Sequence, residues 1–345
     1  MDISSLGEFE LIARLTRGLH ETGDQLLGIG DDCAILDLHA PTLLLATGDS
    51  QVEGVHFTLH TSSPEQIGRK ALAVNLSDIA AMGGEPRYAL ISLILPPSLP
   101  LAVLDGIYAG LRYQADDFTT TIVGGNISGA GSSETLIIDI TLLGTIEHGH
   151  ALLRSGAQPG DTLCVTGTLG DSAAGLFTLL YADQALPSTA VEFVRSRCRT
   201  PQPRIHEGRI LSQMGPSIIT AMLDISDGLS GDLAHLCEHS HVGARIHHAQ
   251  IPLSAAIHAI ADHSQHDALE WALHGGEDYE LLFTVSPGNE HTVINTVREA
   301  TGTQVTAIGT ILPQEDGMHQ VFADGHDEQL IARSWDHLKP GYDGH

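Results

Sequence analysis

The chain has 345 residues, and its 16 Lys+Arg against 43 Asp+Glu give a formal net charge of −27. At roughly 150 residues per domain, this length predicts two domains. A hydrophobic fraction of 42% is typical of a folded globular protein and excludes disorder as a description of the whole chain. Nucleic-acid binding is not expected, because phosphate backbones require basic patches and none is visible. For most of the carboxylates, a solvated surface that aids solubility is the simple explanation.

Cysteine usage and the start of the chain indicate the cellular compartment. The cysteines are widely spaced and form no CxxC pair, so we expect reduced thiols in a cytoplasmic protein. They are Cys33, Cys164, Cys198 and Cys237. The first residues lack the basic start and apolar stretch of a signal peptide, and no apolar run approaches the roughly 18–20 residues that span a bilayer. We therefore expect a soluble intracellular protein without a membrane partner.

Lysine is rare in this chain. Lys70 and Lys339 are the only two, against 14 arginines. Neither stands in a GxxxxGK[ST] loop, so the sequence excludes a P-loop nucleotide site. If the protein handles polyphosphates, groups other than a P-loop lysine must neutralise them.

Hydrophobic periodicity and the placement of glycine and proline predict alternating helices and strands in the first half of the chain. Helices are expected over residues 8–19, 65–82 and 101–116. Strands are expected over residues 34–36, 42–47, 88–95, 120–123 and 134–146. A second set of elements begins near Ala151.

In this second half, strands are expected over residues 161–166, 217–224, 279–285 and 303–311. Helices are expected over residues 171–182 and 229–239. Between them, a further helix is expected after the prolines at 201 and 203, ending at Leu211. Both halves mix strands and helices, so the sequence predicts an α/β or α+β protein of two lobes, with domains over residues 1–148 and 149–345.

Acidic residues recur beside glycine at the expected junctions of strands and helices, where a solvated face explains them poorly. Adjacent carboxylates suit Mg²⁺ or Ca²⁺, which prefer hard oxygen ligands, although a Gly-Asp pair alone is more often a plain turn. The segments are GIGDD at 28–32, TGD at 47–49, NLSD at 75–78, GGN at 124–126, DISDG at 224–228 and HGGEDYE at 274–280.

Two of these segments leave alternatives open. Asp78 lies in an apolar stretch of an expected helix and shares a face with Lys70, so either an ion pair with that lysine or a metal ion could compensate its charge. In DISDG, Ser226 or Asp227 could cap the following helix. That interpretation leaves Asp224 unexplained.

In this order, the motifs resemble those of the thiamine-monophosphate kinase family, within the superfamily of aminoimidazole ribonucleotide synthetase and selenophosphate synthetase. The resemblance covers nearly the whole chain. Its segments are GIGDDCA (28–34), VEGVHF (52–57), KALAVNLSD (70–78), GGN (124–126), RSGA (154–157), VTGTLGDSAAGL (165–176), DISDGL (224–229) and GGEDYE (275–280).

The resemblance implies transfer of the γ-phosphoryl group of ATP to thiamine monophosphate, giving thiamine diphosphate, with several Mg²⁺ ions. It implies a two-lobed aminoimidazole ribonucleotide synthetase-like fold. The lobe at 1–148 would hold ATP and Mg²⁺ and pair across a homodimer into a β-barrel-like sheet. The α/β lobe at 149–345 would complete the substrate site.

The resemblance also implies roles for individual residues. Metal ligands would be Asp32, Asp49, Asp78 and Asp224, with Thr47 and Gly48 beside them and Asn126 and Asp227 at further metal positions. ATP would contact Tyr108, Gly125, Asn126, Arg154 and Ser226. Thiamine monophosphate would contact His56, Glu277 and Tyr342, with Trp335 as the rival of Tyr342. Gly48 stands where the family commonly has Thr, and Asn126 where many members have Asp.

Two anionic substrates repel each other in a closed site, and Mg²⁺ held by an Asp-rich cleft is the plausible neutralising charge. The acceptor phosphate has a second pKa near about 6, so it is already a nucleophile and we assign no general base. His56 is expected to orient the acceptor, and Arg154 either to stabilise the transferring group or only to bind the nucleotide. The alternatives are another ATP-dependent enzyme of the superfamily and a non-catalytic metal- or nucleotide-binding module.

Overall fold

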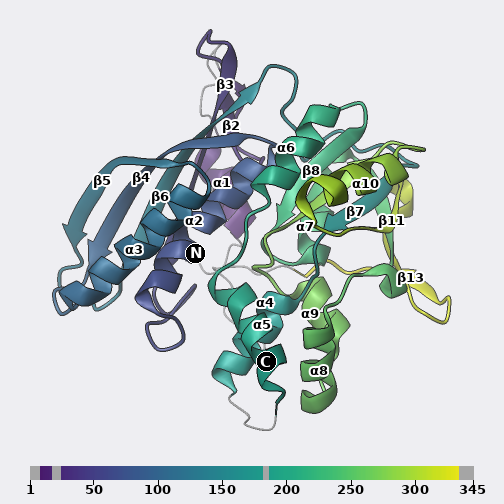
Figure 1. Ribbon diagram of the computed structural model, residues 1–345. Helices are drawn as coiled ribbons and strands as arrows, with labels where there is room; N and C mark the ends of the chain where they lie inside the picture. The colour runs from purple at the N-terminus through teal and green to yellow at the C-terminus, as the bar shows by residue number, and fades with distance from the viewer. Residues whose placement is uncertain (1–7, 18–24, 182–185, 334–345) are drawn as a thin grey trace.

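The computed structural model describes residues 8–17, 25–181 and 186–333 (Figure 1). Two open β-sheets lie side by side, each with helices packed on it, and a group of four helices lies below them in this view. No described helix has the length and apolar character that crossing a membrane requires. All four cysteines of the chain fall in the described part, and each is buried and free.

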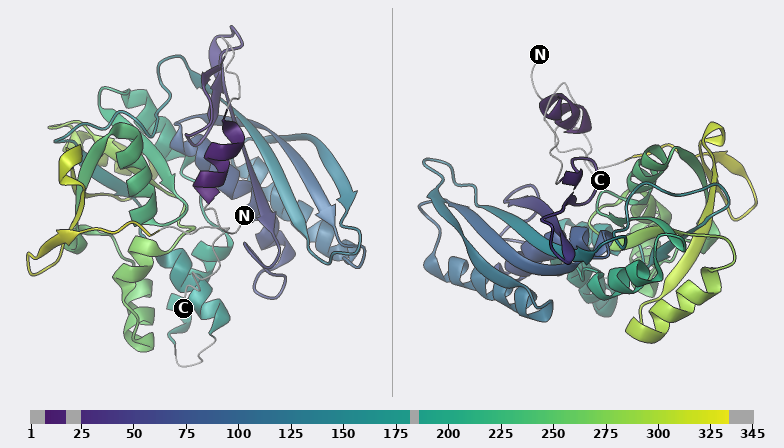
Figure 2. Two further views of the ribbon diagram at one scale, coloured as in Figure 1. Left: turned by 180° about the vertical axis from the view of Figure 1, so that it is seen from behind. Right: turned by 90° about the horizontal axis from the view of Figure 1, so that it is seen from above.

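The first sheet has six strands in the order β1-β2-β3-β6-β4-β5, and only β4 and β5 run parallel. Its strands are β1 (Gln25–Leu27), β2 (Ala34–Leu36), β3 (Thr42–Val52), β4 (Glu85–Leu95), β5 (Thr121–Gly129) and β6 (Ile137–Glu147). Helices α2 (Pro64–Ala81) and α3 (Leu101–Asp117) cover one face. From behind, strands β4 and β5 carry no helix (Figure 2, left).

The second sheet has seven strands in the order β13-β12-β9-β11-β7-β10-β8, and only β12 and β9 run parallel. Its strands are β7 (Thr162–Thr166), β8 (Ile219–Ile225), β9 (Val242–His247), β10 (Glu280–Val285), β11 (Val305–Pro313), β12 (Met318–Val321) and β13 (Asp327–Gln329). Neither sheet closes on itself within the described residues, so a barrel is not present in the single chain.

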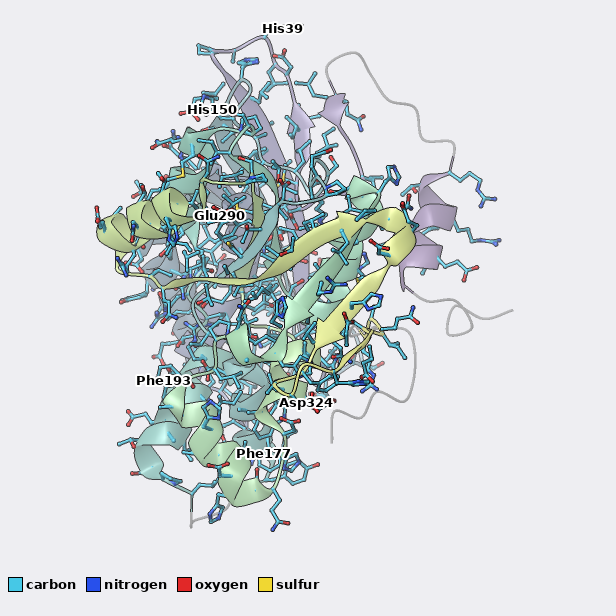
Figure 3. All side chains as sticks on the ribbon, turned by 90° about the vertical axis from the view of Figure 1, so that its right-hand side faces the viewer. His39, His150, Phe177, Phe193, Glu290 and Asp324 are labelled. Carbon is cyan, nitrogen blue, oxygen red and sulfur yellow. The ribbon has the colours of Figure 1, made fainter. Side chains whose placement is uncertain are left out.

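The other helices are α1 (Glu8–Thr16), α4 (Asp171–Leu180), α5 (Ser188–Arg199), α6 (Ile205–Met214), α7 (Leu229–Ser240), α8 (Ala255–Ser264), α9 (Ala268–His274) and α10 (Glu290–Thr301). Helices α4, α5, α8 and α9 pack on one another around a small apolar core of their own. Phe177 of α4 and Phe193 of α5 mark this group in Figure 3.

Helix α2 is the central element of the molecule. A capping box starts it: Ser63 Oγ accepts from the Gln66 backbone N–H, and the Gln66 side chain accepts from Ser63 N–H. The helix packs on β3 and β6 of the first sheet and also on β8 of the second. Gly68 and Gly110 let α2 and α3 approach closely, because a Cβ at either position would lie 2.0 Å from a backbone oxygen of the other helix. A helix buried on most sides is thus positioned between the two sheets.

Most of the predicted elements are confirmed, but two strands continue well beyond their expected ends. Strand β3 continues to Val52 and β5 to Gly129, so Asp49 and Asn126 lie inside strands rather than after them. The expectation that the TGD and GGN segments lie at strand junctions was wrong, because β3 pairs with β6 along all eleven of its residues and β5 pairs with β4 through Gly129. Elements β1, β9, β12, β13, α5, α8, α9 and α10 were not predicted. Helix α10 shows one reason: its fully buried residues are only Val293 and Val297, too narrow a stripe to recognise.

Candidate functional site

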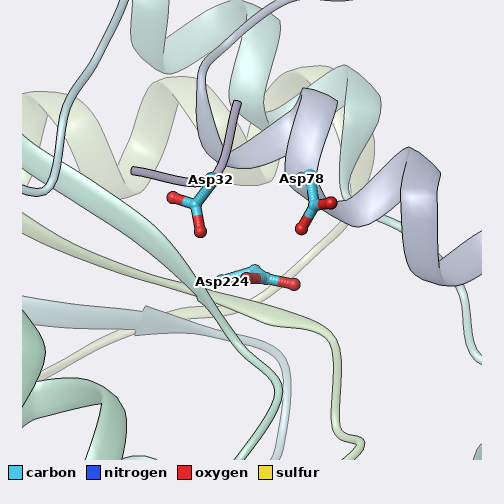
Figure 4. Close-up of side chains that lie close together, drawn as sticks. All are labelled: Asp32, Asp78 and Asp224. Carbon is cyan, nitrogen blue, oxygen red and sulfur yellow. The ribbon is translucent and has the colours of Figure 1, made fainter. Parts of the chain in front are cut away.

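Three carboxylates from separate segments meet between the two sheets (Figure 4). Asp32 precedes β2, Asp78 lies on α2 and Asp224 lies near the end of β8. One oxygen from each lies within 4.8 Å of the others. The sequence predicted all three as metal ligands, and the fold brings them together.

Each of these carboxylates has a partner that orients it. Thr47 Oγ1 on β3 donates to Asp78 Oδ2 at 2.5 Å, and Ser77 Oγ donates to Asp224 Oδ2 at 2.5 Å. Arg154 Nη2 donates to Asp32 Oδ1 at 2.6 Å. The side chains are therefore held in place without any bound group.

The electrostatics of the cluster disfavour three bare anions. Burial, followed by repulsion from Asp32, raises the pKa of Asp224 to about 7. Burial, followed by repulsion from Asp49 and Asp224, raises the pKa of Asp78 well above its ordinary value. Asp32 Oδ2 is buried and has no hydrogen-bond partner among the described residues. A cluster that offers only oxygen atoms as ligands, one of them without a hydrogen-bond partner, suits a hard divalent cation such as Mg²⁺.

The cluster opens into a cavity of about 1310 Å³. Ligand pockets usually enclose about 300–1,000 Å³, so this one has room for more than one small ligand. The described lining holds nine carboxylates and three cationic side chains. The carboxylates are those of Asp31, Asp32, Asp49, Asp78, Asp224, Asp227, Asp267, Glu270 and Glu277, and the cations are Lys70, Arg154 and Arg333.

Each of the three cations is paired with a carboxylate of the same lining. Arg154 contacts Asp32, Lys70 contacts Glu277 and Arg333 contacts Glu270. The open alternative of a Lys70–Asp78 pair is thereby decided, because Lys70 pairs with Glu277 while Asp78 accepts from Thr47.

His56 and Glu277, predicted to contact the acceptor, both line the cavity. The Lys70 ammonium lies 2.7 Å from Glu277 Oε1 and donates to the His56 backbone oxygen at 3.1 Å. The Val52 backbone N–H donates to His56 Nδ1 at 3.0 Å. Nδ1 is therefore the unprotonated nitrogen, and in the neutral ring Nε2 carries the hydrogen.

The DISDG segment turns into α7 around a carboxylate that the sequence analysis did not single out. The backbone N–H groups of Ser226 and Asp227 both donate to Asp232 Oδ2 at 3.1 Å. The N-cap of α7 is Gly228, with φ +106° and no side-chain cap bond, so the interpretation of Ser226 or Asp227 as the cap was wrong. Asp232 lies eight residues after Asp224 in the sequence and only its position in the first turn of α7 could have indicated this role.

Several predicted site residues are not brought to this cavity in the single chain. Tyr108 lies on α3, Gly125 and Asn126 lie on the edge strand β5, and none of them lines the cavity. Gly48 is also absent from its lining. Asn126 is paired in register with Ser92, which lies between buried neighbours and faces the side of the sheet without helices. Tyr342 and Trp335 lie outside the described residues.

Comparison with known proteins defines the class. Residues 30–146 match the model of the N-terminal domain of AIR synthase related proteins, and residues 158–321 match that of their C-terminal domain. The chain thus has the mixed α/β two-domain architecture of AIR synthase related proteins.

Full-length relatives narrow this class further. Thiamine-monophosphate kinase of Bacillus subtilis is 36% identical over 97% of this chain and 100% of its own length. The enzyme of Escherichia coli K12 is 39% identical over 96% of this chain and 98% of its own length. The solved structure of "AaThiL complexed with AMPPCP and TMP" is 35% identical, with a TM-score of 0.84, and covers 98% of this chain and 99% of its own. The chain belongs to the thiamine-monophosphate kinase family.

Proposed function

We propose that this protein transfers the γ-phosphoryl group of ATP to thiamine monophosphate and forms thiamine diphosphate. One observation carries the proposal: Asp32, Asp78 and Asp224 meet in a cavity that is also lined by His56 and Glu277. A single cavity with metal-type ligands and acceptor-type ligands suits a reaction between two phosphates. The related structure in complex with AMPPCP, an ATP analogue, and TMP supports the same pair of substrates.

Asp32, Asp78 and Asp224, with Asp49 and Asp227 on the same lining, would hold Mg²⁺. Bound there, Mg²⁺ would neutralise phosphate charge and stabilise the transferring group. The chain's own contribution is to fix the oxygen donors before substrates arrive, through Thr47 and Ser77. Preorganised donors do not have to reorient during the reaction.

We propose roles for the remaining cavity residues from their positions and, for His56, from which ring nitrogen carries the hydrogen. Arg154 and Ser226 line the cavity beside the carboxylates, where we propose that they bind the nucleotide. His56 donates from Nε2 to an acceptor oxygen, because its Nδ1 accepts from the main chain. A nitrogen that donates a hydrogen bond orients the acceptor and cannot take a proton from it. His56 is therefore not assigned as a general base.

We further propose a homodimer in which the uncovered face of the first sheet pairs with that of a second copy. Large apolar side chains are exposed on β4 and β5. They are Tyr88, Leu90, Ile94 and Val123. A contiguous apolar sheet face of this kind is typical of an interface, and two such sheets could complete the expected barrel-like arrangement.

Tyr108, Gly125 and Asn126 remain proposed nucleotide or metal contacts. Gly125 and Asn126 lie on strand β5, beside the proposed interface. We propose that the domain over residues 1–148 serves dimerisation and ATP and Mg²⁺ binding, and that the domain over residues 149–345 completes the substrate site. We propose a cytoplasmic location, because all four cysteines are free thiols.

Product identification tests the main proposal. The chain is incubated with ATP and Mg²⁺, with and without thiamine monophosphate, and the products are separated. We expect ADP and thiamine diphosphate in equal amounts, and only when the acceptor is present. ADP release that is independent of the acceptor would count against the kinase, and binding without turnover would favour a non-catalytic module.

A further inference from the structure

Lys70 is a buried cation that joins two parts of the proposed acceptor site. It lies on α2 and is 5% exposed. Its ammonium contacts Glu277 Oε1 at 2.7 Å and the backbone oxygen of His56 at 3.1 Å. The two contacts tie the segment that follows β3 to the GGEDYE loop that precedes β10.

Burying an ammonium is costly unless a carboxylate and further hydrogen bonds compensate it. Burial alone lowers the pKa of Lys70, but the attraction of Glu277, the electrostatic contribution of Cys198 and the hydrogen bond to Glu277 together outweigh burial and hold that pKa above its usual range. The lysine is therefore charged at neutral pH. Because its side chain is 7% exposed while that of Glu277 is 27% exposed, the carboxylate is the member of the pair that remains accessible.

The backbone at Glu277 is held independently of this ion pair. Glu277 has φ +67°, in the left-handed region that non-glycine residues seldom adopt, and its N–H donates to the Ser226 backbone oxygen at 2.7 Å. The main chain is thus fixed at the end of β8, and Lys70 determines where the carboxylate points. Without that cation, a side chain in a lining rich in aspartates would be repelled from its present position.

We propose that Lys70 is a positioning residue for the phosphorylated organic cation that serves as acceptor. It holds the Glu277 carboxylate and the His56 main chain in the arrangement that receives thiamine monophosphate. This inference depends on the proposed function. Glu277 presents negative charge to the positively charged thiazolium of the acceptor, and Lys70 does not contact the transferring phosphoryl group.

The test compares Lys70→Met with the neighbouring control Arg69→Met in the full chain. Arg69 stacks on Tyr113 and does not line the cavity. For Lys70→Met we expect the KM for thiamine monophosphate to rise by about tenfold or more, with the KM for ATP and the kcat within about threefold of wild type. Arg69→Met should leave both KM values unchanged.

A double-mutant cycle with Glu277→Gln adds a second readout. If Lys70 acts through Glu277, the double variant K70M/E277Q should bind thiamine monophosphate no more weakly than the weaker single variant, as measured by calorimetry. Additive losses would overturn the proposal. So would equal increases in both KM values, or a large loss of kcat with an unchanged KM for the acceptor.

Two controls distinguish a variant that does not fold, or a wrong proposed function, from a wrong role for Lys70. If Lys70→Met does not fold, Lys70→Arg keeps the charge, and it should retain acceptor affinity better than Glu277→Gln does. Wild-type chain that binds thiamine monophosphate without turnover would refute the kinase but leave the Lys70 comparison intact by calorimetry. Wild-type chain that does not bind it would refute both.

Discussion

Ser77 Oγ donates a 2.5 Å hydrogen bond to Asp224 Oδ2, which joins helix α2 of the first sheet to strand β8 of the second. Both residues are buried, with exposed fractions of 0% and 4%. The next residue on α2 is Asp78, a member of the same carboxylate cluster. One turn of α2 therefore supplies one carboxylate of the cluster and orients another, which comes from the second sheet.

Ser77→Ala should lower both stability and turnover. The substitution leaves a buried carboxylate oxygen without its donor, which costs about 1–3 kcal/mol, and it frees Asp224 to rotate. Urea unfolding and steady-state kinetics measure the two effects. Ser196→Ala is the matched control: its hydroxyl donates to the Phe193 backbone oxygen of the same helix, at an exposed site. Unchanged turnover in Ser77→Ala would show that Asp224 needs no such orientation.

Asp78→Asn should abolish most turnover while leaving the metal-free protein as stable as wild type or more stable. Burial, followed by repulsion from neighbouring carboxylates, raises the pKa values of Asp78 and Asp224, so removing one charge relieves repulsion in the absence of metal. Thermal unfolding with EDTA and with Mg²⁺ measures this. We expect Mg²⁺ to raise the Tm of wild type more than that of the variant. Wild-type-like activity at ordinary Mg²⁺ concentrations would remove Asp78 from the site.

The buried Glu280 should make the fold sensitive to acid. Its carboxylate accepts hydrogen bonds from Arg197, from Thr166 and, at 2.6 and 2.5 Å, from Arg204. Burial by itself would raise the pKa of Glu280, but the arginines hold it below the ordinary value of 4.5. A lowered carboxyl pKa contributes stability that is complete above pH 4.5 and is lost as the pH falls through the folded-state pKa.

Glu280→Gln should therefore cost about 3 kcal/mol at pH 7, because Arg197 and Arg204 lose their shared carboxylate and Arg204 is left with its 3.8 Å contact with Glu207. The cost should shrink as the pH falls below 4.5. Urea unfolding at several pH values measures the difference, with the exposed Glu299→Gln as control. An equal loss at every pH would mean that the Glu280 charge does not contribute to stability.

Leu90→Asp should convert the proposed homodimer into monomers. Leu90 is 40% exposed on the uncovered face of strand β4, and a buried carboxylate in its place would be costly in an apolar interface. Light scattering coupled to gel filtration measures the mass. Leu101→Asp, at a residue 70% exposed at the start of α3, should leave the assembly unchanged. A monomeric wild type at micromolar concentration would refute the interface.

Helix α2 shows how far local signals determine structure. Pro64 at its start and the Gly83-Gly84 pair after its end predict its limits to within a residue, because caps and breakers act over a single turn. The extent of β3 could not be predicted in this way. Its continuation through Gly48 depends on β6, which lies far along the chain.

In the candidate site, too, some features could be predicted from the sequence and others depend on distant segments. Residue type singled out the segments of Asp32, Asp78 and Asp224, because carboxylates beside glycines or in apolar surroundings are unusual, and the family resemblance predicted these three as metal ligands. Sequence spacing also placed Lys70 on the face of Asp78, yet its partner is Glu277, from a loop beyond β8. Such a pairing depends on how α2 packs against the second sheet.

The amino-acid sequence by itself determined the chemistry of this protein: acidic oxygen donors, scarce lysines, and motifs shared with one family. Only the tertiary structure decided which of these groups meet. It brings together three aspartates from the segment before β2, from α2 and from β8, and it turns Asn126 to the opposite side of the first sheet, because alternate side chains of a strand point to opposite faces. Side-chain chemistry is carried by each residue alone, whereas proximity arises from strand pairing and helix packing between distant segments.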